Sequence, residues 1–298
     1  MWLLKSSIIP KIISIPYFHS VPLVQKIYDK YCASHESLSS SIHHLRNQNY
    51  GIILDYAMEH KKEESIKTRD MILKNIELLR PSDMIAIKPS SLTEKDLEYI
   101  LTYCHDKKQK TMIDAEEYEH QIKMHSYIRS LQLTYNISDP WLYNTYQCYL
   151  KNTHEQLKYD IEMFKNYNVP LGIKLVRGAY LDYEIKTAIE RKIPKPVYDN
   201  IYQTHASYNR SLVHCLKMLE YVRLNVATHN SRSIHIAKKN IKAYYSNVTF
   251  SQLTGMGDDL GKSLINDGYM VYKYLPYASY KDMIPYLLRR LKESRIII

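Results

Sequence analysis

The sequence predicts an α/β fold, a closed (β/α)8 barrel. Eight short runs are typical of β-strands, the one at 143–147 more weakly than the others, and a helical segment follows each of them. The 298 residues suit a barrel of this kind, which usually has ~250 residues with insertions. Strand–helix alternation implies parallel strands joined by right-handed crossovers. A doubly wound open sheet is the alternative, but eight units favour closure.

The predicted elements alternate along most of the chain. The strands are expected at 52–56, 84–88, 111–114, 143–147, 172–178, 225–229, 248–253 and 269–275. The helical segments are expected at 59–79, 94–107, 116–133, 154–167, 182–221, 231–244, 259–266 and 281–295. The longest of these, 182–221, should divide into two helices around Pro194 and Pro196.

Polar side chains stand where several predicted strands end. They are Lys88, Asp114, Gln147, Arg177 with Gly178, and Thr228 with His229. In a parallel barrel the carboxyl ends of the strands meet at one rim, where function is located. Packing alone does not explain polar residues at several independent strand ends, so we expect a site at this rim.

The last predicted helix has two faces. Ile284, Leu287, Leu288 and Leu291 form one apolar stripe. The opposite face carries Tyr286, Arg289, Arg290 and Glu293. A solvated charged face is the ordinary interpretation of such a helix. Two adjacent guanidiniums could instead grip a carboxylate, whose geometry matches their planar fork. The helix alone leaves both interpretations open.

Composition excludes few function classes. The formal net charge is +10, but Lys and Arg are mixed with acids along the chain, and no nucleic-acid-binding signature accompanies them. We therefore expect no nucleic-acid partner. The four cysteines, Cys32, Cys104, Cys148 and Cys215, are widely spaced. This pattern indicates buried thiols in a reducing compartment rather than a disulfide or zinc framework.

The N-terminal segment resembles a targeting sequence. The first 28 residues contain no acid and carry Lys5, Lys11 and Lys26, as in a mitochondrial presequence, although such segments usually favour Arg. No segment reaches the ~20 apolar residues that span a bilayer. We expect residues 1–25 to be an N-terminal extension with a targeting role, and residues 26–298 to be one catalytic domain.

Three motifs carry weak signals. The segment "GMGDDLG" (255–261) has the spacing GxGxxxG, which differs from the dinucleotide-binding GxGxxG. His120 and His125 are five residues apart, a poor spacing for two metal ligands on one helix face. The acids after Asp114 could suggest a metal, but they also suit the start of a helix. We predict no metal site.

Six sequence blocks resemble one known family. They are "TMIDAEE", "NTYQCYL", "GIKLVRGAYLDYE" (172–184), "VATHN", "FSQLTGM", and "VYKYLPY" (271–277) followed by "IPYLLRRLKES" (284–294). In this order they are similar to the signatures of proline dehydrogenases (proline oxidases), in particular the eukaryotic mitochondrial branch. The resemblance extends from about Ile52 to Ser294.

The resemblance implies a fold and an activity. The fold would be a TIM-like (β/α)8 barrel with the last helix packed over the barrel mouth and FAD bound at the top of the barrel. The flavoprotein would oxidise L-proline to Δ1-pyrroline-5-carboxylate by hydride transfer to FAD, the first step of proline catabolism. The resemblance also implies a quinone electron acceptor and a peripheral position on the matrix side of the mitochondrial inner membrane.

The resemblance further implies a role for individual residues. Asp114 and Lys174 would be catalytic. The substrate would contact Lys88, Leu253, Tyr274, Tyr286, Arg289 and Arg290, with the three basic residues on its carboxylate. FAD would contact Ala115, Gln147, Arg177, Gly178, Ala179, Thr228, His229 and Glu293. Two physical arguments agree: alternation places Lys174 and Gly178 on one strand face, and a buried carboxylate needs cationic partners.

Two rival functions remain. The first is a hydroxyproline dehydrogenase on the same fold; a bulky Tyr274 near ring C4 would leave little room for the 4-hydroxyl and favours proline. The second is a non-catalytic basic protein that binds nucleic acid or a membrane surface. One departure concerns Pro89, which follows Lys88 where relatives usually continue with Leu and could change how Lys88 is presented.

Overall fold

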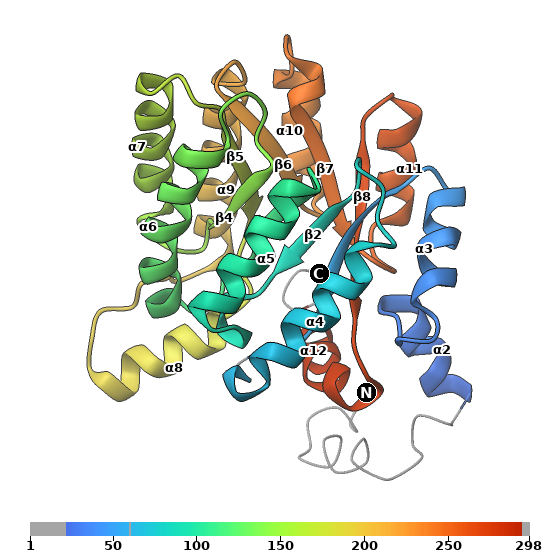
Figure 1. Ribbon diagram of the computed structural model, residues 1–298. Helices are drawn as coiled ribbons and strands as arrows, with labels where there is room; N and C mark the ends of the chain where they lie inside the picture. The colour runs from blue at the N-terminus through green and yellow to red at the C-terminus, as the bar shows by residue number, and fades with distance from the viewer. Residues whose placement is uncertain (1–21, 60, 294–298) are drawn as a thin grey trace.

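The barrel predicted from the sequence is confirmed (Figure 1). The structure is a computed structural model that describes residues 22–59 and 61–293. Eight parallel strands pair in chain order, and the last pairs with the first to close the barrel. The strands are β1 (Gly51–Tyr56), β2 (Met84–Ile87), β3 (Lys110–Ile113), β4 (Leu142–Gln147), β5 (Leu171–Val176), β6 (Val222–Ala227), β7 (Val248–Leu253) and β8 (Val271–Tyr277).

Helices follow the strands around the outside of the barrel (Figure 1). They are α4 (Ser65–Ile76), α5 (Glu94–Asp106), α6 (Tyr118–Tyr135), α7 (Thr153–Asn166), α8 (Leu181–Arg191), α9 (Ile201–Lys217), α10 (Ser231–Asn240), α11 (Asp258–Asn266) and α12 (Tyr280–Glu293). Short 3-10 turns occur at η2 (Lys62–Glu64), η3 (Pro89–Ser91) and η4 (Tyr245–Asn247). The predicted division at Pro194 and Pro196 is confirmed, since both prolines lie between α8 and α9.

Two helices before β1 were not predicted: α2 (Pro22–Tyr31) and α3 (Leu38–Asn47). Both are only ten residues long, so their periodicity is a weak sequence signal. The Tyr28 hydroxyl donates to the carbonyl oxygen of Ala278 at 3.1 Å, which ties α2 to the chain just after β8. Residues 1–21 of the predicted extension lie outside the described part of the chain.

The strands separate two apolar clusters. Side chains inside the barrel come from Ile53, Met84, Ala86, Met112, Tyr143, Tyr272 and Tyr274. Side chains on the other face of the strands, such as Ile52 and Leu54, pack in the large cluster beneath the helices. This division follows the period of two along a strand. Both faces of the strands are therefore buried, and β4 (LYNTYQ) and β7 (VTFSQL) bury polar side chains as well as apolar ones.

The last helix lies over the barrel mouth, as predicted. It begins at Tyr280, directly after β8, and lies across the end of the barrel where the strands finish (Figure 1). Met283 and Tyr286 are buried, and Tyr286 lines the same cavity as residues from the strand ends. The side chains of Arg289, Arg290 and Glu293 lie outside the described residues, so their predicted roles are not tested by the structure.

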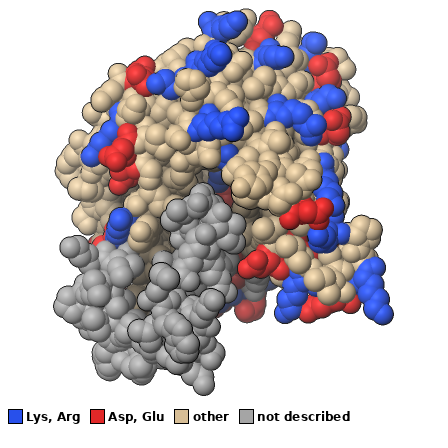
Figure 2. All heavy atoms as spheres, turned by 180° about the vertical axis from the view of Figure 1, so that it is seen from behind, with Lys and Arg blue, Asp and Glu red and all other residues tan. Residues whose placement is uncertain are grey.

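The surface and the cysteines agree with the composition. Figure 2 shows Lys and Arg side chains spread over one face and interspersed with Asp and Glu, rather than gathered in one patch. All four cysteines are buried free thiols, as expected. Among the described residues, no helix combines the length and apolar character needed to cross a bilayer.

Candidate active site

A cavity of about 220 Å³ opens at the carboxyl ends of the strands, beneath α12. It brings together every predicted site residue whose side chain the structure describes. These are Lys88, Asp114, Ala115, Gln147, Lys174, Arg177, Gly178, Ala179, Thr228, His229, Leu253, Tyr274 and Tyr286. They lie in, or within a few residues after, eight different elements, β2 to β8 and α12, so only the closed barrel places them side by side.

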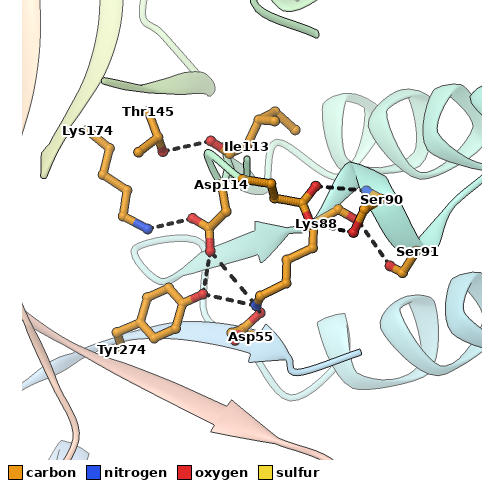
Figure 3. Close-up of polar contacts among 10 residues, drawn as sticks. Asp55, Lys88, Ser90, Ser91, Ile113, Asp114, Thr145, Lys174 and Tyr274 are labelled. Atoms are coloured by element: carbon orange, nitrogen blue, oxygen red, sulfur yellow. Dashed lines mark hydrogen bonds and ion pairs between the residues drawn. The ribbon is translucent and has the colours of Figure 1, made fainter. Parts of the chain in front are cut away.

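Asp114 is the centre of a polar cluster in this cavity (Figure 3). Its Oδ1 accepts a hydrogen bond from Lys174 Nζ at 2.5 Å, and its Oδ2 accepts one from the Tyr274 hydroxyl at 2.5 Å. Burial alone would raise the pKa of the Asp114 carboxyl, but the charges of Lys174 and Lys88 outweigh it, and the pKa is lowered. Asp114 is therefore held as an anion.

Lys88 pairs with a carboxylate that the sequence did not single out. Its Nζ donates to Asp55 Oδ1 and lies 3.4 Å from the Tyr274 hydroxyl and 3.9 Å from Asp114 Oδ2 (Figure 3). Burial lowers the pKa of Lys88, whereas Asp55 and Asp114 raise it, and the net shift is upward. Lys88 therefore stays an ammonium although it is almost fully buried.

The Tyr274 ring lies against both lysines. Lys174 Nζ is 4.6 Å from the ring centroid and Lys88 Nζ is 5.9 Å from it, within cation–π range. Burial raises the pKa of Tyr274 well above its usual value, and the neighbouring Asp114 raises it further. The phenol therefore keeps its proton and remains a donor to Asp114.

Gln147 holds the loop that follows β5. Its Nε2 donates to the Glu116 carbonyl oxygen at 2.8 Å, and its Oε1 accepts from the Ala179 amide at 3.3 Å. The neighbouring Gly178 has φ of +128°, and a Cβ there would lie 2.2 Å from the ring of Tyr149. Glycine is thus required by backbone conformation and by Tyr149, in addition to the predicted approach of a ligand.

Among the described residues, no carboxylate forms an ion pair with the Arg177 guanidinium. It donates to His205 Nδ1 at 2.9 Å, to Thr228 Oγ1 at 2.8 Å and to Ser233 Oγ at 2.8 Å. Its Cζ also lies 4.2 Å from the centroid of the Tyr208 ring. Burial lowers the pKa of Arg177, because no anion compensates the loss of water.

The N-terminus of α10 reaches the same wall of the cavity. Asn230 caps it by accepting from the Ser233 amide at 2.9 Å. The preceding His229 accepts the Leu253 amide on Nε2 at 3.3 Å, so neutral His229 carries its proton on Nδ1. A helix N-terminus beside an uncompensated guanidinium favours a bound anion.

The cavity includes residues that the sequence did not predict. They are Glu59, Thr145, Val176, Tyr180, Ala227, Asn230, Ser251, Gln252 and Met256. Most stand within a few residues of a predicted one, so their position at a strand end was the available signal. Asp55 does not line the cavity, but it contacts Lys88, which does.

Pro89 does not remove the Lys88 side chain from the site. It occupies the first position of η3, and Lys88 before it is extended, with φ of −101° and ψ of 107°, as expected for a residue that precedes proline. The Lys88 side chain still lines the cavity. Within residues 22–59 and 61–293, no group of three or more His, Cys, Asp or Glu side chains could hold a metal ion.

Comparisons with known proteins agree on one family. A family model described as proline dehydrogenase matches residues 38–296. The mitochondrial proline dehydrogenase 1 of Dictyostelium discoideum is 33% identical over 225 residues, which cover 68% of this chain and 39% of that protein. The hydroxyproline dehydrogenase of Xenopus laevis is 38% identical over 175 residues, which cover 55% of this chain and 37% of that protein.

A solved structure shares the fold. Proline utilization A from Bdellovibrio bacteriovorus, inactivated by N-propargylglycine, superimposes with a TM-score of 0.83 at 20% sequence identity. The match covers 91% of this chain and 33% of that one. This chain therefore spans well under half the length of the two curated relatives and of the solved structure.

Proposed function

Because this chain belongs to the proline dehydrogenase family, we propose that it is an enzyme that oxidises L-proline to Δ1-pyrroline-5-carboxylate with FAD as its cofactor. The observation that carries the proposal is the convergence of thirteen predicted site residues on one cavity. These residues come from motifs far apart in the sequence, and Asp114, Lys174 and Tyr274 among them contact one another.

The cavity suits FAD in its charge and its shape. Arg177 and the N-terminus of α10 offer positive charge without a carboxylate partner among the described residues, which suits a pyrophosphate. Ala115, Val176 and Ala227 supply small apolar walls for a planar ring. Gln147, Arg177, Gly178, Ala179, Thr228 and His229 would hold the cofactor, together with Ala115 and Glu293.

When bound, FAD would supply the hydride acceptor, since a flavin carries redox chemistry that side chains cannot perform. The residues of this chain would position the substrate and control charge. Lys174 and Tyr274 keep Asp114 ionised, so the Asp114 carboxylate would offer a fixed negative charge to the positive charge that develops on the substrate nitrogen.

The substrate would lie between the cluster and α12. Its carboxylate would be held by Arg289, Arg290 and Lys88, because a carboxylate in a buried site needs charged partners. Tyr274, Tyr286 and Leu253 would form the apolar walls around the ring. All three side chains line the cavity, and Tyr286 belongs to α12 itself.

An absorbance spectrum tests the proposal. The purified protein should be yellow, and L-proline should bleach the flavin band in the absence of an electron acceptor. A colourless protein would instead support the alternative of a basic binding protein, whose affinity for polyanions would fall steeply with salt. A yellow protein that L-proline leaves unchanged would contradict the substrate assignment.

Hydroxyproline is the second candidate substrate. The hydroxyproline dehydrogenase of Xenopus laevis is 38% identical to this chain over the matched residues. Against it stands the bulk of Tyr274, which is held in place by its contacts with Asp114 and Lys174. Initial rates with L-proline and 4-hydroxyproline at equal concentrations separate the two; a clear preference for 4-hydroxyproline would refute the argument from Tyr274.

The cellular setting is proposed from relatives. The Dictyostelium relative is named mitochondrial, and the acid-free residues 1–25 suit a targeting extension that precedes the catalytic domain at 26–298. We propose a quinone as acceptor and a peripheral position on the matrix side of the inner membrane. Fusion of residues 1–25 to a fluorescent protein tests the targeting role, and mixing the reduced enzyme with quinones tests the acceptor.

A further inference from the structure

Two carboxylates flank the Lys88 ammonium in different environments, Asp55 fully buried and Asp114 partly buried. Both oxygens of Asp114 are occupied, one by Lys174 and the other by the Tyr274 hydroxyl. Asp55 Oδ1 accepts from Lys88, but Asp55 Oδ2 has no hydrogen-bond partner among the described residues. Asp55 is completely buried. A buried polar atom without a partner is rare and unfavourable, so Asp55 has an oxygen that would gain from a proton, whereas each oxygen of Asp114 already accepts a hydrogen bond.

The surroundings of the two carboxylates shift their pKa values in opposite directions. Burial raises the pKa of Asp55, and this effect exceeds the lowering by the Lys88 charge. The pKa of Asp114 is lowered, because Lys174 and Lys88 outweigh its burial. When neighbouring groups are shifted apart in this way, one usually acts as the proton acceptor and the other stays ionised.

The proposed reaction needs a proton acceptor. A ring amine carries a proton near neutral pH, and its lone pair must be free before the ring carbon can lose hydride. Lys88 lines the cavity, whereas Asp55 lies behind it. Since the amine and the carboxylate of an α-amino acid share one carbon, a substrate whose carboxylate lies at Lys88 has its amine within a few ångströms.

We propose that Asp55 accepts the amine proton of the substrate through Lys88, while Asp114 remains ionised. The inference rests on the proposed function. One Lys88 proton passes to the Asp55 carboxylate, and the lone pair freed on Lys88 Nζ takes a proton from the substrate ammonium, whose N–H bond breaks. Lys88 keeps its charge, Asp55 becomes neutral, and the electron pair of the broken bond stays on the substrate nitrogen.

The groups around Asp55 are consistent with this role. Lys88 faces it from the end of β2 and Asp114 from the end of β3, each one residue beyond the strand. Tyr274 and Tyr277 face it from β8, and Glu59 lies in the segment after β1. Lys88 is the cation that contacts Asp55 directly. Both tyrosines have pKa values raised by burial, so neither competes with Asp55 as an acceptor.

The pH dependence of flavin bleaching tests the proposal. With saturating L-proline and no electron acceptor, Asp55→Asn should bleach roughly 100-fold more slowly than the native protein near pH 7. The difference in bleaching rate between Asp55→Asn and the native protein should shrink about tenfold for each pH unit above pH 7, because the free substrate then supplies more neutral amine. Asp55→Glu, which keeps a carboxylate, should recover part of the rate.

Asp160→Asn is the matched control. Asp160 is equally buried, but it lies on α7 and does not line the cavity. Its loss should leave the pH profile of bleaching unchanged. A deficit of Asp55→Asn that is the same at every pH would show a merely structural role and would overturn the proposal, as would a native rate. A native protein that L-proline does not bleach would instead refute the proposed function itself.

Infrared difference spectroscopy gives a readout without turnover. The holoenzyme, reduced beforehand so that it cannot accept hydride, is mixed with L-proline or with the ring carboxylate that has oxygen in place of the amine nitrogen. L-proline should produce the carbonyl band of a protonated carboxylic acid, and the oxygen analogue should not. The band should be absent in Asp55→Asn and present in Asp160→Asn. A band that persists in Asp55→Asn would assign the proton elsewhere.

Discussion

The Tyr274 hydroxyl, on β8, donates to Asp114 Oδ2, just after β3, at a distance of 2.5 Å across the barrel mouth. The two residues are 160 positions apart in the sequence. Because the same hydroxyl also lies 3.4 Å from Lys88 Nζ, Tyr274 links the anionic centre of the site to the lysine that Asp55 holds. It is therefore both a wall of the cavity and a part of its charge network.

Removal of this hydroxyl should slow the reaction without loss of the bound flavin. Tyr274→Phe keeps the ring but takes one donor from Asp114, and a hydrogen bond to a charged group contributes about 1.5–3 kcal/mol. We expect kcat to fall roughly 10- to 100-fold while the flavin content stays native. Tyr143→Phe is the control, since Tyr143 lies inside the barrel but does not line the cavity. Equal rates for Tyr274→Phe and the native protein would contradict a role for the hydroxyl.

Gly178 should tolerate no side chain. Its φ of +128° disfavours every L-residue, and a Cβ would overlap the Tyr149 ring. Gly178→Ala should lower the free energy of unfolding by about 2 kcal/mol or more and reduce the flavin content. Gly268→Ala is a matched control, because Gly268 also has a positive φ, of +85°, but its added Cβ would meet only the Tyr245 hydroxyl, at 3.4 Å. Urea unfolding and the absorbance ratio of flavin to protein measure both effects; a smaller loss for Gly178→Ala than for Gly268→Ala would contradict the steric argument.

The contact between Lys174 and Asp114 should appear as an energetic coupling. Their side chains are only 8% and 12% exposed, and removal of one partner from a buried pair costs about 3–5 kcal/mol, because the other charge is left uncompensated. Lys174→Met should therefore destabilise the protein more than the double variant Lys174→Met/Asp114→Asn. A double-mutant cycle of unfolding free energies measures the difference. Strict additivity of the two single changes would show that the contact contributes no coupling.

Much of the site could be predicted, because strand periodicity and the barrel rim together determine where side chains meet. Lys88, Asp114 and Gln147 each end a predicted strand, and the closed sheet necessarily brings such positions to one rim. Asp55 was not predicted as a site residue, although it is an acid inside the apolar strand GIILDY. Its importance depends on the register between β1 and β2, which one strand's sequence does not contain.

The missed helices have a different cause. The ten-residue α3 is rich in Ser and His, and its apolar stripe is only Leu38, Ile42 and Leu45. Helices of this length derive most of their stability from tertiary packing, so local sequence carries little signal for them. The resemblance supplied what periodicity could not, namely the position of α12 over the mouth, which the burial of Tyr286 confirms.

Asp160 provides a pH-dependent test of the barrel wall, away from the cavity. It accepts hydrogen bonds from His125 at 2.8 Å, Arg129 at 2.9 Å and Tyr146 at 2.8 Å. Burial opposes its ionisation, but these donors outweigh burial and lower its pKa. A carboxyl with a lowered folded-state pKa stabilises the protein above its unfolded-state pKa, near 3.8, and loses this contribution as pH falls through the folded value.

Asp160→Asn should therefore cost about 3 kcal/mol of unfolding free energy at about pH 5, and clearly less at about pH 3, where the unfolded chain takes up a proton at this carboxyl and the contribution of the native anion to stability falls. Asp259→Asn makes the same change at an exposed carboxylate and should alter stability little at either pH. Urea midpoints of the three proteins at both pH values measure these differences. If the loss of unfolding free energy caused by Asp160→Asn grew on acidification, the protein would stabilise the neutral carboxyl. That result would contradict a hydrogen-bonded Asp160 anion on α7.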